Sequence, residues 1–264
     1  MIVGDVMYGP KLIEGKTKII YAVPESEKSY SLPAPHLAYM VHKDSITAGD
    51  GAKRDVISDK GVLSCSTTSA VFRFLERAGI ETHYVETLDE RTMLVRRVDM
   101  APIEWVARRL AAGSYIRRTG AAEGTRFDPL VLELFYKDDA QHDPLITGDE
   151  ALEMGLCTRE EFEAGLAATE RVFTLLERAW AAQDIQLVDL KIEFGRTPNG
   201  LLLADVIDND SWRLWPGGQR ERMLDKQVYR DLKGSDEAAL EEVRQLYIEV
   251  AERAERFDAT TDVA

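Results

Sequence analysis

Charged and apolar residues alternate over residues 187–194, and this alternation constrains the fold more than any other feature of the chain. The segment reads Leu-Val-Asp-Leu-Lys-Ile-Glu-Phe. Because successive side chains of a β-strand point to opposite faces, Asp189, Lys191 and Glu193 share one face of the predicted strand. The apolar residues between them pack into a core on the other face. The pattern therefore predicts a strand that carries a row of charged groups into a site.

A second apolar segment ends at Asp205, and the residues between the two segments are turn formers that favour a β-hairpin. If residues 198–200 form a three-residue loop, Thr197 pairs with Leu201, and Glu193 lies directly across from Asp205. Two facing carboxylates repel each other unless a cation lies between them, and oxygen ligands suit magnesium. The hairpin therefore predicts a magnesium site beside a lysine, which indicates phosphoryl chemistry.

The composition limits the class of protein. The chain has 264 residues, enough for one large domain or two closely packed ones, and 45% of them are hydrophobic. No run is long and apolar enough to cross a bilayer, and the first residues do not follow the signal-peptide pattern. The net charge of −14 disfavours nucleic acid and anionic lipid as partners. The two cysteines fit reduced thiols, so we expect a cytoplasmic protein.

Hydrophobic periodicity predicts an order of elements along the chain. Strands are expected over 18–23, 37–41, 82–86, 92–99 and 103–109, and helices over 62–78, 158–182 and 235–256. The second helix opens on a capping box, Thr158 with Glu161. The polar, glycine-rich residues 44–54 are expected to form a loop, and a loop of this length is a candidate lid. A crossing between two domains is expected at 97–102.

A glycine and two lysines stand before the first strand, in the sequence Glu-Gly-Lys-Thr-Lys over 14–18. Gly15 lets the backbone approach phosphates closely, and Lys16 and Lys18 supply positive charge. The spacing is not that of a Walker loop, and a strand follows where a Walker loop has a helix. An ordinary basic turn is the alternative interpretation.

Three further groups can recognise anions or cations. A strand over 103–109 places Glu104 and Arg108 on one face, followed by a small-residue turn that exposes the Ser114 hydroxyl. Arginine matches phosphate or carboxylate with two parallel hydrogen bonds, although a structural Glu104–Arg108 pair is the alternative. Lys137 can reach a nucleotide, and Asp143 can orient a cation or an amine. Arg213, which follows the acidic hairpin, can meet an anion.

Together these segments resemble the SAICAR synthetase family, the phosphoribosylaminoimidazole-succinocarboxamide synthases, over about residues 11–233. Residues 204–213, Ala-Asp-Val-Ile-Asp-Asn-Asp-Ser-Trp-Arg, resemble the synthetase part of the animal bifunctional enzyme more than the usual short bacterial form. The resemblance implies an α+β fold related to the ATP-grasp and protein-kinase folds. It also implies a small N-terminal antiparallel sheet domain over 1–98 and a larger α/β domain with a C-terminal helix over 99–264.

The resemblance implies an ATP-dependent ligase of de novo purine biosynthesis. Such an enzyme joins L-aspartate to the carboxylate of CAIR through an acyl phosphate and releases SAICAR, ADP and phosphate. By resemblance, the residues that bind ATP are Gly15, Lys16, Thr17, Lys18, Arg96, Val98 and Lys137. Those implied at CAIR are Arg108, Ser114 and Arg213. Those implied where the carboxylate and the amine meet are Asp189, Lys191 and Asp143, while Glu193 and Asp205 bind Mg²⁺ and act in catalysis.

Three alternatives stay open at this point. One is another ATP-dependent carboxylate–amine ligase, and another is a small-molecule kinase, although the HRD and DFG motifs of protein kinases are absent from the sequence. A third is a nucleotide-sensing module without catalysis. In each case the partners are small molecules, and a homo-oligomer is compatible with the sequence.

Overall fold

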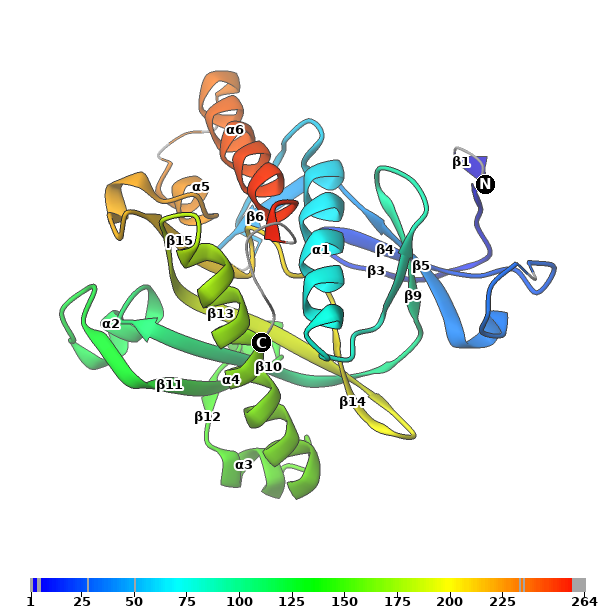
Figure 1. The fold of residues 1–264 in the computed structure, drawn as a ribbon, viewed down its shortest axis with the longest axis horizontal. Coiled ribbons are helices and arrows are strands. Elements are labelled where there is room, and N and C mark those ends of the chain that lie inside the picture. The colour runs from blue at the N-terminus through cyan, green and yellow to red at the C-terminus, as the bar shows by residue number, and fades with distance from the viewer. Residues whose placement is uncertain are drawn as a thin grey trace.

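Two antiparallel sheets and a layer of helices make up the computed structural model, which describes residues 2–3, 6–27, 29–49, 51–232, 234 and 236–257 (Figure 1). The five-stranded sheet has the spatial order β3 (Lys11–Glu14), β4 (Lys18–Ala22), β5 (Leu37–His42), β9 (Thr92–Arg96) and β8 (Tyr84–Thr87). Two short pairs are β1 (Ile2–Val3) with β2 (Val6–Met7), and β6 (Ser45–Ala48) with β7 (Lys53–Val56).

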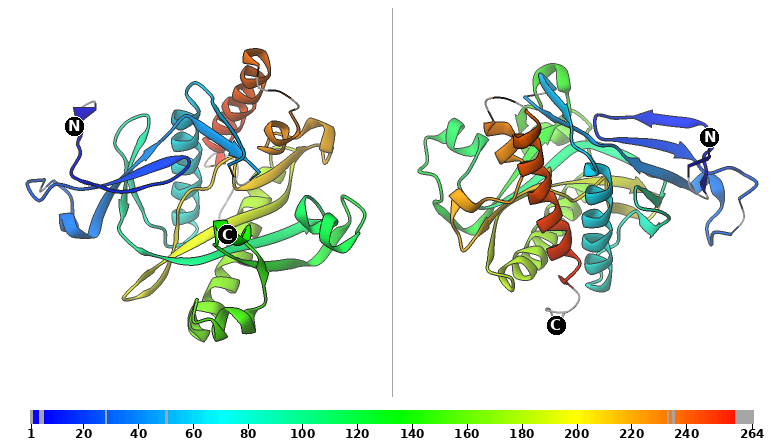
Figure 2. Two further views of the ribbon diagram at one scale, coloured as in Figure 1. Left: turned by 180° about the vertical axis from the view of Figure 1, so that it is seen from behind. Right: turned by 90° about the horizontal axis from the view of Figure 1, so that it is seen from above.

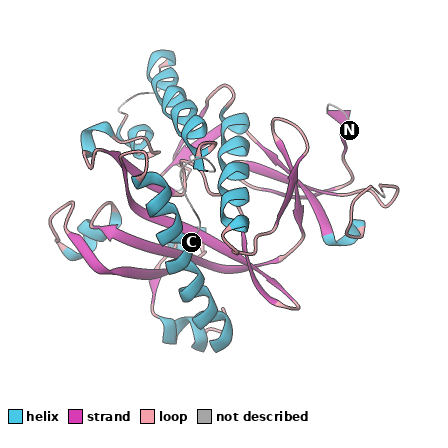
Figure 3. Ribbon diagram, in the orientation of Figure 1, coloured by secondary structure: helices cyan, strands magenta, loops and turns pink. Residues whose placement is uncertain are grey.

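The six-stranded sheet carries the long strands, drawn in magenta with the others in Figure 3. Its order is β12 (Leu145–Ile146), β11 (Arg126–Tyr136), β10 (Asp99–Leu110), β13 (Ile185–Thr197) and β14 (Gly200–Ala204), and β15 (Trp212–Pro216) also pairs with β13. The chain passes from one sheet to the other between β9 and β10. The predicted two-domain division at residue 98 stays a prediction, because the main hydrophobic core is continuous from Met40 and Val95 to Trp105 and Leu190.

The three long helices pack on one side of the sheets, as the view from above shows (Figure 2). They are α1 (Lys60–Arg77), α4 (Arg159–Ala181) and α6 (Glu237–Ala254), and the short helices are α2 (Ser114–Thr119), α3 (Gly148–Glu153) and α5 (Gln227–Asp231). Short 3-10 turns lie at 34–36, 139–141 and 220–222. Helix α1 contacts the five-stranded sheet and α6, while α4 contacts β10 and β13. None of the helices in the described ranges is long and apolar enough to cross a membrane.

Local sequence explains most of the predicted elements. The predicted capping box of α4 is confirmed, since the Thr158 side chain accepts a hydrogen bond from the Glu161 amide and the Glu161 side chain bonds the Thr158 amide. Helix α6 buries Val243, Tyr247 and Val250, as its apolar stripe predicts. Both cysteines are buried free thiols.

The expected loop over 44–54 is wrong in part, because most of it forms the β6–β7 hairpin; residue 50 lies outside the described residues. A periodicity argument misses the hairpin because its turn is rich in glycine and Val56 is apolar but exposed. Ile46 is fully buried in a small core with Tyr229 and Tyr247. The Lys53 ammonium donates to the carbonyl oxygens of Tyr229 at 2.8 Å and Leu232 at 3.0 Å, which ties the hairpin to α5.

Candidate active site

A row of charged side chains crosses one face of the six-stranded sheet. Arg108 on β10 is the direct register partner of Asp189 on β13, and Asp189 is the direct partner of Arg213 on β15. Asp189 Oδ2 accepts hydrogen bonds from Arg108 Nη1 at 2.6 Å and from Arg213 Nη1 at 2.5 Å. The alternating residues Leu190 and Ile192 lie in the core, as the sequence predicts. Alternate side chains of β13 therefore face the hydrophobic core, and those between them face the site.

A second row lies four residues further along the same strands. Glu104 on β10 and Glu193 on β13 are direct register partners, a like-charged pairing that is unfavourable without a cation. Lys191 Nζ bridges them, at 2.8 Å from Glu104 Oε1 and 3.2 Å from Glu193 Oε1, and Lys137 also bonds Glu193. Burial alone would lower the pKa of the Lys191 ammonium, but the charges of Glu193 and Glu104 outweigh it and raise that pKa well above its usual value.

The predicted hairpin register is wrong by one residue. Thr197 pairs with Gly200 and Glu193 with Ala204, because the loop consists of two residues, Pro198 and Asn199. A shift of one residue would turn Asp205 to the opposite face if the strand continued. The strand ends at Ala204 instead.

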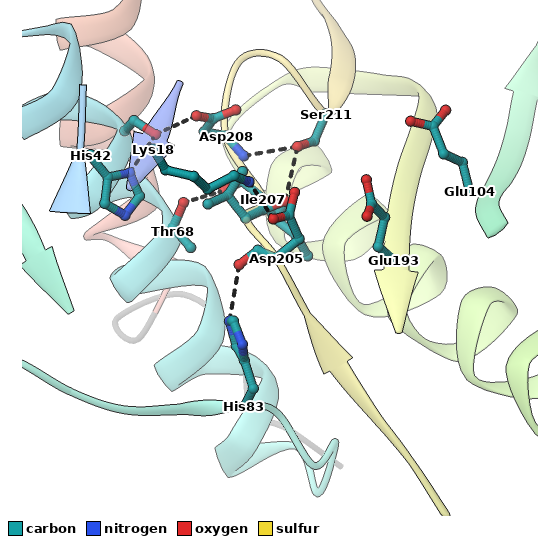
Figure 4. A network of polar contacts seen from close by, with 12 residues as sticks. Lys18, His42, Thr68, His83, Glu104, Glu193, Asp205, Ile207, Asp208 and Ser211 are labelled. Atoms are coloured by element: carbon teal, nitrogen blue, oxygen red, sulfur yellow. Dashed lines mark hydrogen bonds and ion pairs between the residues drawn. The ribbon is translucent and has the colours of Figure 1, made fainter. Parts of the chain in front are cut away.

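Asp205 reaches the site because its backbone adopts the left-handed conformation, with φ +63°, which aspartate tolerates better than most residues. Its carboxylate bonds Lys18, and its carbonyl oxygen lies 3.0 Å from His83 Nε2 (Figure 4). Burial alone would raise the pKa of the Asp205 carboxyl. The positive charge of Lys18, with those of Lys191 and Lys137, outweighs burial and lowers that pKa far below its usual value. Burial lowers the pKa of His83 to about 4, so this histidine is neutral at pH 7.

A cavity of about 350 Å³, here called the apolar cavity, lies between the five-stranded sheet and the edge of the six-stranded sheet. Its apolar lining includes Leu12, Ile13, Ile20, Ala38, Met40, Val95, Val98 and Met100. Charged groups gather at one part of its wall: Lys18, Lys137, Glu193 and Asp205. Gly15 and Arg96 also line it. Such a cavity suits a flat apolar ring with an anionic tail.

A second cavity of about 390 Å³, here called the polar cavity, lies over the charged face of the six-stranded sheet. Its lining includes the predicted residues Lys16, Thr17, Lys18, Arg108, Ser114, Asp189, Lys191, Asp205 and Arg213. Lys18 and Asp205 line both cavities. The two cavities therefore meet at this ion pair.

The geometry bears on two further sequence expectations. The role expected of Asp143 stays a prediction: it is not among the residues that line either cavity, and its Oδ1 accepts a hydrogen bond from the Asp138 amide at 2.9 Å. The alternative of a Glu104–Arg108 pair is wrong, because Glu104 contacts Lys191. Asp189 lies under two guanidinium groups, so its local role is to hold them.

Several residues of the polar cavity escape the sequence argument. Lys226 and Arg230 line it, beside Asp208, Asp210 and Ser211. Lys226 Nζ donates to Asp210 Oδ2 at 2.9 Å. The signal for the two cations is their spacing of four residues around a short helix, which puts both on one face. Their acidic partner lies in a separate segment, so the spacing alone does not reveal the contact.

The comparisons with known proteins agree with this geometry. The SAICAR synthetase family profile matches residues 11–246. A phosphoribosylaminoimidazole-succinocarboxamide synthase of Roseiflexus sp. strain RS-1 is 56% identical, over 94% of this chain and 98% of its own length. The multifunctional protein ADE2 of Gallus gallus is 42% identical over 95% of this chain, which covers 59% of the chicken protein. The predicted likeness to the animal synthetase part is thus confirmed, and the Roseiflexus protein shares more identity still.

Solved structures agree with the predicted α+β fold. The phosphoribosylaminoimidazole-succinocarboxamide synthase of Ehrlichia chaffeensis has a TM-score of 0.81 at 33% identity, covering 93% of this chain and 98% of that one. A structure described as SAICAR synthetase (Type-2) in complex with ADP has a TM-score of 0.80 at 33% identity, covering 92% of this chain and 96% of that one. This chain therefore belongs to the SAICAR synthetase family, the ATP-dependent ligases that form SAICAR in purine biosynthesis.

Proposed function

We propose that this protein joins L-aspartate to the carboxylate of CAIR with hydrolysis of ATP, and that the two cavities hold the two large substrates. The observation that carries this assignment is the ion pair between Lys18 and Asp205, which lines both cavities. A phosphoryl group that passes from ATP to CAIR must cross between their sites. A purine-biosynthetic ligase of this kind is expected in the cytoplasm.

ATP is assigned to the apolar cavity. Its base fits between the apolar side chains, and the backbone at Arg96 and Val98 lies at the same wall. The turn between β3 and β4 brings Gly15 and Lys18 to this cavity, and Lys16 and Thr17 to the polar one. Its hydrogen bond from the Gly15 amide to the Lys18 carbonyl oxygen, 2.9 Å, holds the turn in place. A family structure at 33% identity is described as a complex with ADP, which supports nucleotide binding but not the choice of cavity.

Magnesium is assigned to Glu193 and Asp205. Mg²⁺ in phosphoryl-transfer sites takes one or two carboxylates and completes its shell with phosphate and water oxygens, so two acids at one cavity wall suit it. Lysines that contact these acids in this structure, Lys137 and Lys18, are the groups that can turn to phosphate oxygens instead. When bound, the ion would neutralise charge on the phosphates. Among the described residues no group of three or more His, Cys, Asp or Glu side chains is arranged for a metal.

The phosphate of CAIR is assigned to Arg108, Arg213 and Ser114 in the polar cavity. Guanidinium groups bind phosphate through paired charge-assisted hydrogen bonds. Asp189 holds both guanidinium groups from below, so they are oriented before the substrate arrives. Binding energy gained at the phosphate, far from the reacting carboxylate, can then align the reactants.

The chemistry requires an activated carboxylate, because the carbon of a carboxylate is a poor electrophile. The γ-phosphoryl group moves to a carboxylate oxygen of CAIR, which gives an acyl phosphate and ADP. The aspartate amine then attacks the carbonyl carbon, phosphate leaves, and the amide of SAICAR forms. Lys18 and Lys191 supply positive charge where these oxygens gather, and the site must exclude water from the acyl phosphate.

The test is an ADP-release assay on the purified protein with ATP, CAIR, L-aspartate and Mg²⁺, omitting one component at a time. We expect ADP release to need all four. Release without aspartate would favour a small-molecule kinase, and equal turnover with another amine would favour a different carboxylate–amine ligase. Binding of ATP without any turnover would favour a nucleotide sensor.

The β6–β7 hairpin is our candidate for the lid that excludes water, because Thr47 lines the polar cavity. We expect ATP plus CAIR to slow limited proteolysis within residues 44–54 severalfold, since closure would cover the exposed turn. Cleavage at an unchanged rate would remove this segment from the mechanism.

A further inference from the structure

The charged row continues past Arg108 to Glu133 on β11 and Arg118 on α2, which the proposed reaction does not use. Glu133 faces the same side as Arg108, because it pairs with Val106, two residues before Arg108 on β10. Glu133 Oε2 accepts a hydrogen bond from Arg108 Nε at 2.7 Å, and Oε1 accepts one from Arg118 Nη2 at 2.5 Å. The Glu133 side chain is only 8% exposed. One buried carboxylate therefore joins two cations.

Charges alternate along this row. Its members in order are Arg118, Glu133, Arg108, Asp189 and Arg213, three cations and two anions. The row therefore carries one more positive than negative charge, and a bound phosphate anion would neutralise that excess. Two of the three nitrogens of the Arg108 guanidinium donate to carboxylates on either side, which fixes its plane. A fixed plane is what two-point recognition of a phosphate requires.

Glu133 also contacts α2, the helix that carries Ser114 of the proposed phosphate site. Arg118 lies in α2, the helix that begins at Ser114, and the contact between Arg118 and Glu133 ties this short helix to β11. The Arg118 guanidinium also lies 5.8 Å from the ring centroid of Phe135 on the same strand. A single carboxylate thus sets the position of Arg108 directly and of Ser114 through α2.

We propose that Glu133 is a positioning residue for the phosphate of CAIR, acting through Arg108 and α2 without touching the substrate. The inference rests on the proposed function and deepens it. It assigns phosphate recognition to the whole row and limits the effect of Glu133 to that part of the substrate.

The test is Glu133→Gln, which keeps the shape of the side chain but replaces one acceptor oxygen with a donor amide. One of the two arginines then faces a donor. We expect the KM for CAIR to rise about tenfold, the size of one lost charge-assisted hydrogen bond. The kcat and the KM for ATP should stay within about twofold of wild type, the pattern of lost uniform binding. The inhibition constant of the CAIR riboside, which lacks the phosphate, should not change.

The chain offers a matched control on the opposite face of β10. Arg109 donates to Glu177 on α4 through Nε at 2.7 Å and Nη2 at 2.9 Å, and this pair is also mostly buried. Glu177→Gln should lower the melting temperature about as much as Glu133→Gln, but it should leave the KM for CAIR unchanged. A difference between the two variants in KM alone separates positioning from general stability.

Two results would overturn the inference: a wild-type KM for CAIR in Glu133→Gln, or an equal loss of affinity for CAIR and its riboside. If Glu133→Gln does not fold, Arg118→Met takes its place. This substitution keeps the buried Glu133–Arg108 pair and removes only the contact between α2 and Glu133. It should raise the KM for CAIR about threefold, and an unchanged KM would again overturn the inference. A wild-type protein that releases no aspartate-dependent ADP would instead refute the proposed function, and the inference with it.

Discussion

Removing the Lys191 ammonium should set two carboxylates against each other. Glu104 and Glu193 are direct register partners on adjacent strands, and Lys191 bridges them. In Figure 4 both carboxylates point to the same side of the sheet. The substitution Lys191→Met keeps the length of the side chain and removes the charge. The measured quantity is the free energy of unfolding, because the variant is expected to be inactive.

The magnitude follows from the two contacts. Since both oxygens bond the same nitrogen, at 2.8 Å and 3.2 Å, they lie no further apart than the sum, about 6 Å. Two like charges at that distance, at an effective dielectric constant near 20, repel by about 3 kcal/mol. Lys137 still contacts Glu193, and a third of the Lys191 side chain is exposed, so screening reduces this value. We expect a loss of about 2 kcal/mol at pH 8.

The loss should depend on pH in a defined direction. Without Lys191 the repulsion between Glu104 and Glu193 acts only while both carboxylates are charged, and a proton on either one removes it. The destabilisation should therefore be largest at pH 8 and shrink as the pH falls. In the wild type, the stability due to the raised pKa of Lys191 itself is fully present throughout this range.

Urea unfolding of both proteins at pH 5.5 and pH 8 measures this difference. The double variant Lys191→Met with Glu104→Gln is the control, because it removes one of the repelling charges and should recover most of the loss at pH 8. An equal loss at both pH values, or no recovery in the double variant, would refute the electrostatic argument. The loss would then reflect packing alone.

Two other predictions concern the metal and the phosphate site. Glu193→Gln and Asp205→Asn should each lower magnesium-dependent turnover at least about a hundredfold while the circular dichroism spectrum is unchanged, and full activity in either would contradict their assignment to Mg²⁺. Gly113→Ala should raise the KM for CAIR about tenfold or more, because a Cβ there would lie 2.2 Å from Arg213 Nη2 and φ is +58°. Gly120→Ala shares the positive φ, at +72°, but meets nothing within 4 Å, so it should leave that KM unchanged; equal effects would show that backbone strain alone is responsible.

The sequence predicts the strand at 185–197 and its two faces well, because strand periodicity is a local property of the chain. The exact hairpin register depends on whether the turn has two or three residues, and Pro-Asn-Gly is compatible with both. The predicted pairing of Glu193 with Asp205 is therefore wrong, yet both acids line the apolar cavity. The left-handed backbone at Asp205 compensates for the one-residue change in register, and no sequence pattern predicts that conformation.

Residues that act in separate segments are the hardest to predict. Lys226 and Asp210 contact each other. Lys226 lies at the N-terminus of α5 and Asp210 lies in the loop before β15, so their proximity depends on the whole fold. The resemblance to a family named no role for Lys226. The substrate contact expected of Asp143 stays a prediction, since its carboxylate accepts a hydrogen bond within its own loop in this structure.

Lys18 and Asp205 form a partition between the two cavities, the chambers that the proposed function assigns to different substrates. On that assignment, a substitution at this partition should change the affinity for both substrates, since the same pair would contact both. Variation that adapts the enzyme to a new nucleotide or a new acceptor must therefore begin at the outer walls of the chambers. A substitution of Lys18 or Asp205 should instead change how the two reactants are placed relative to each other.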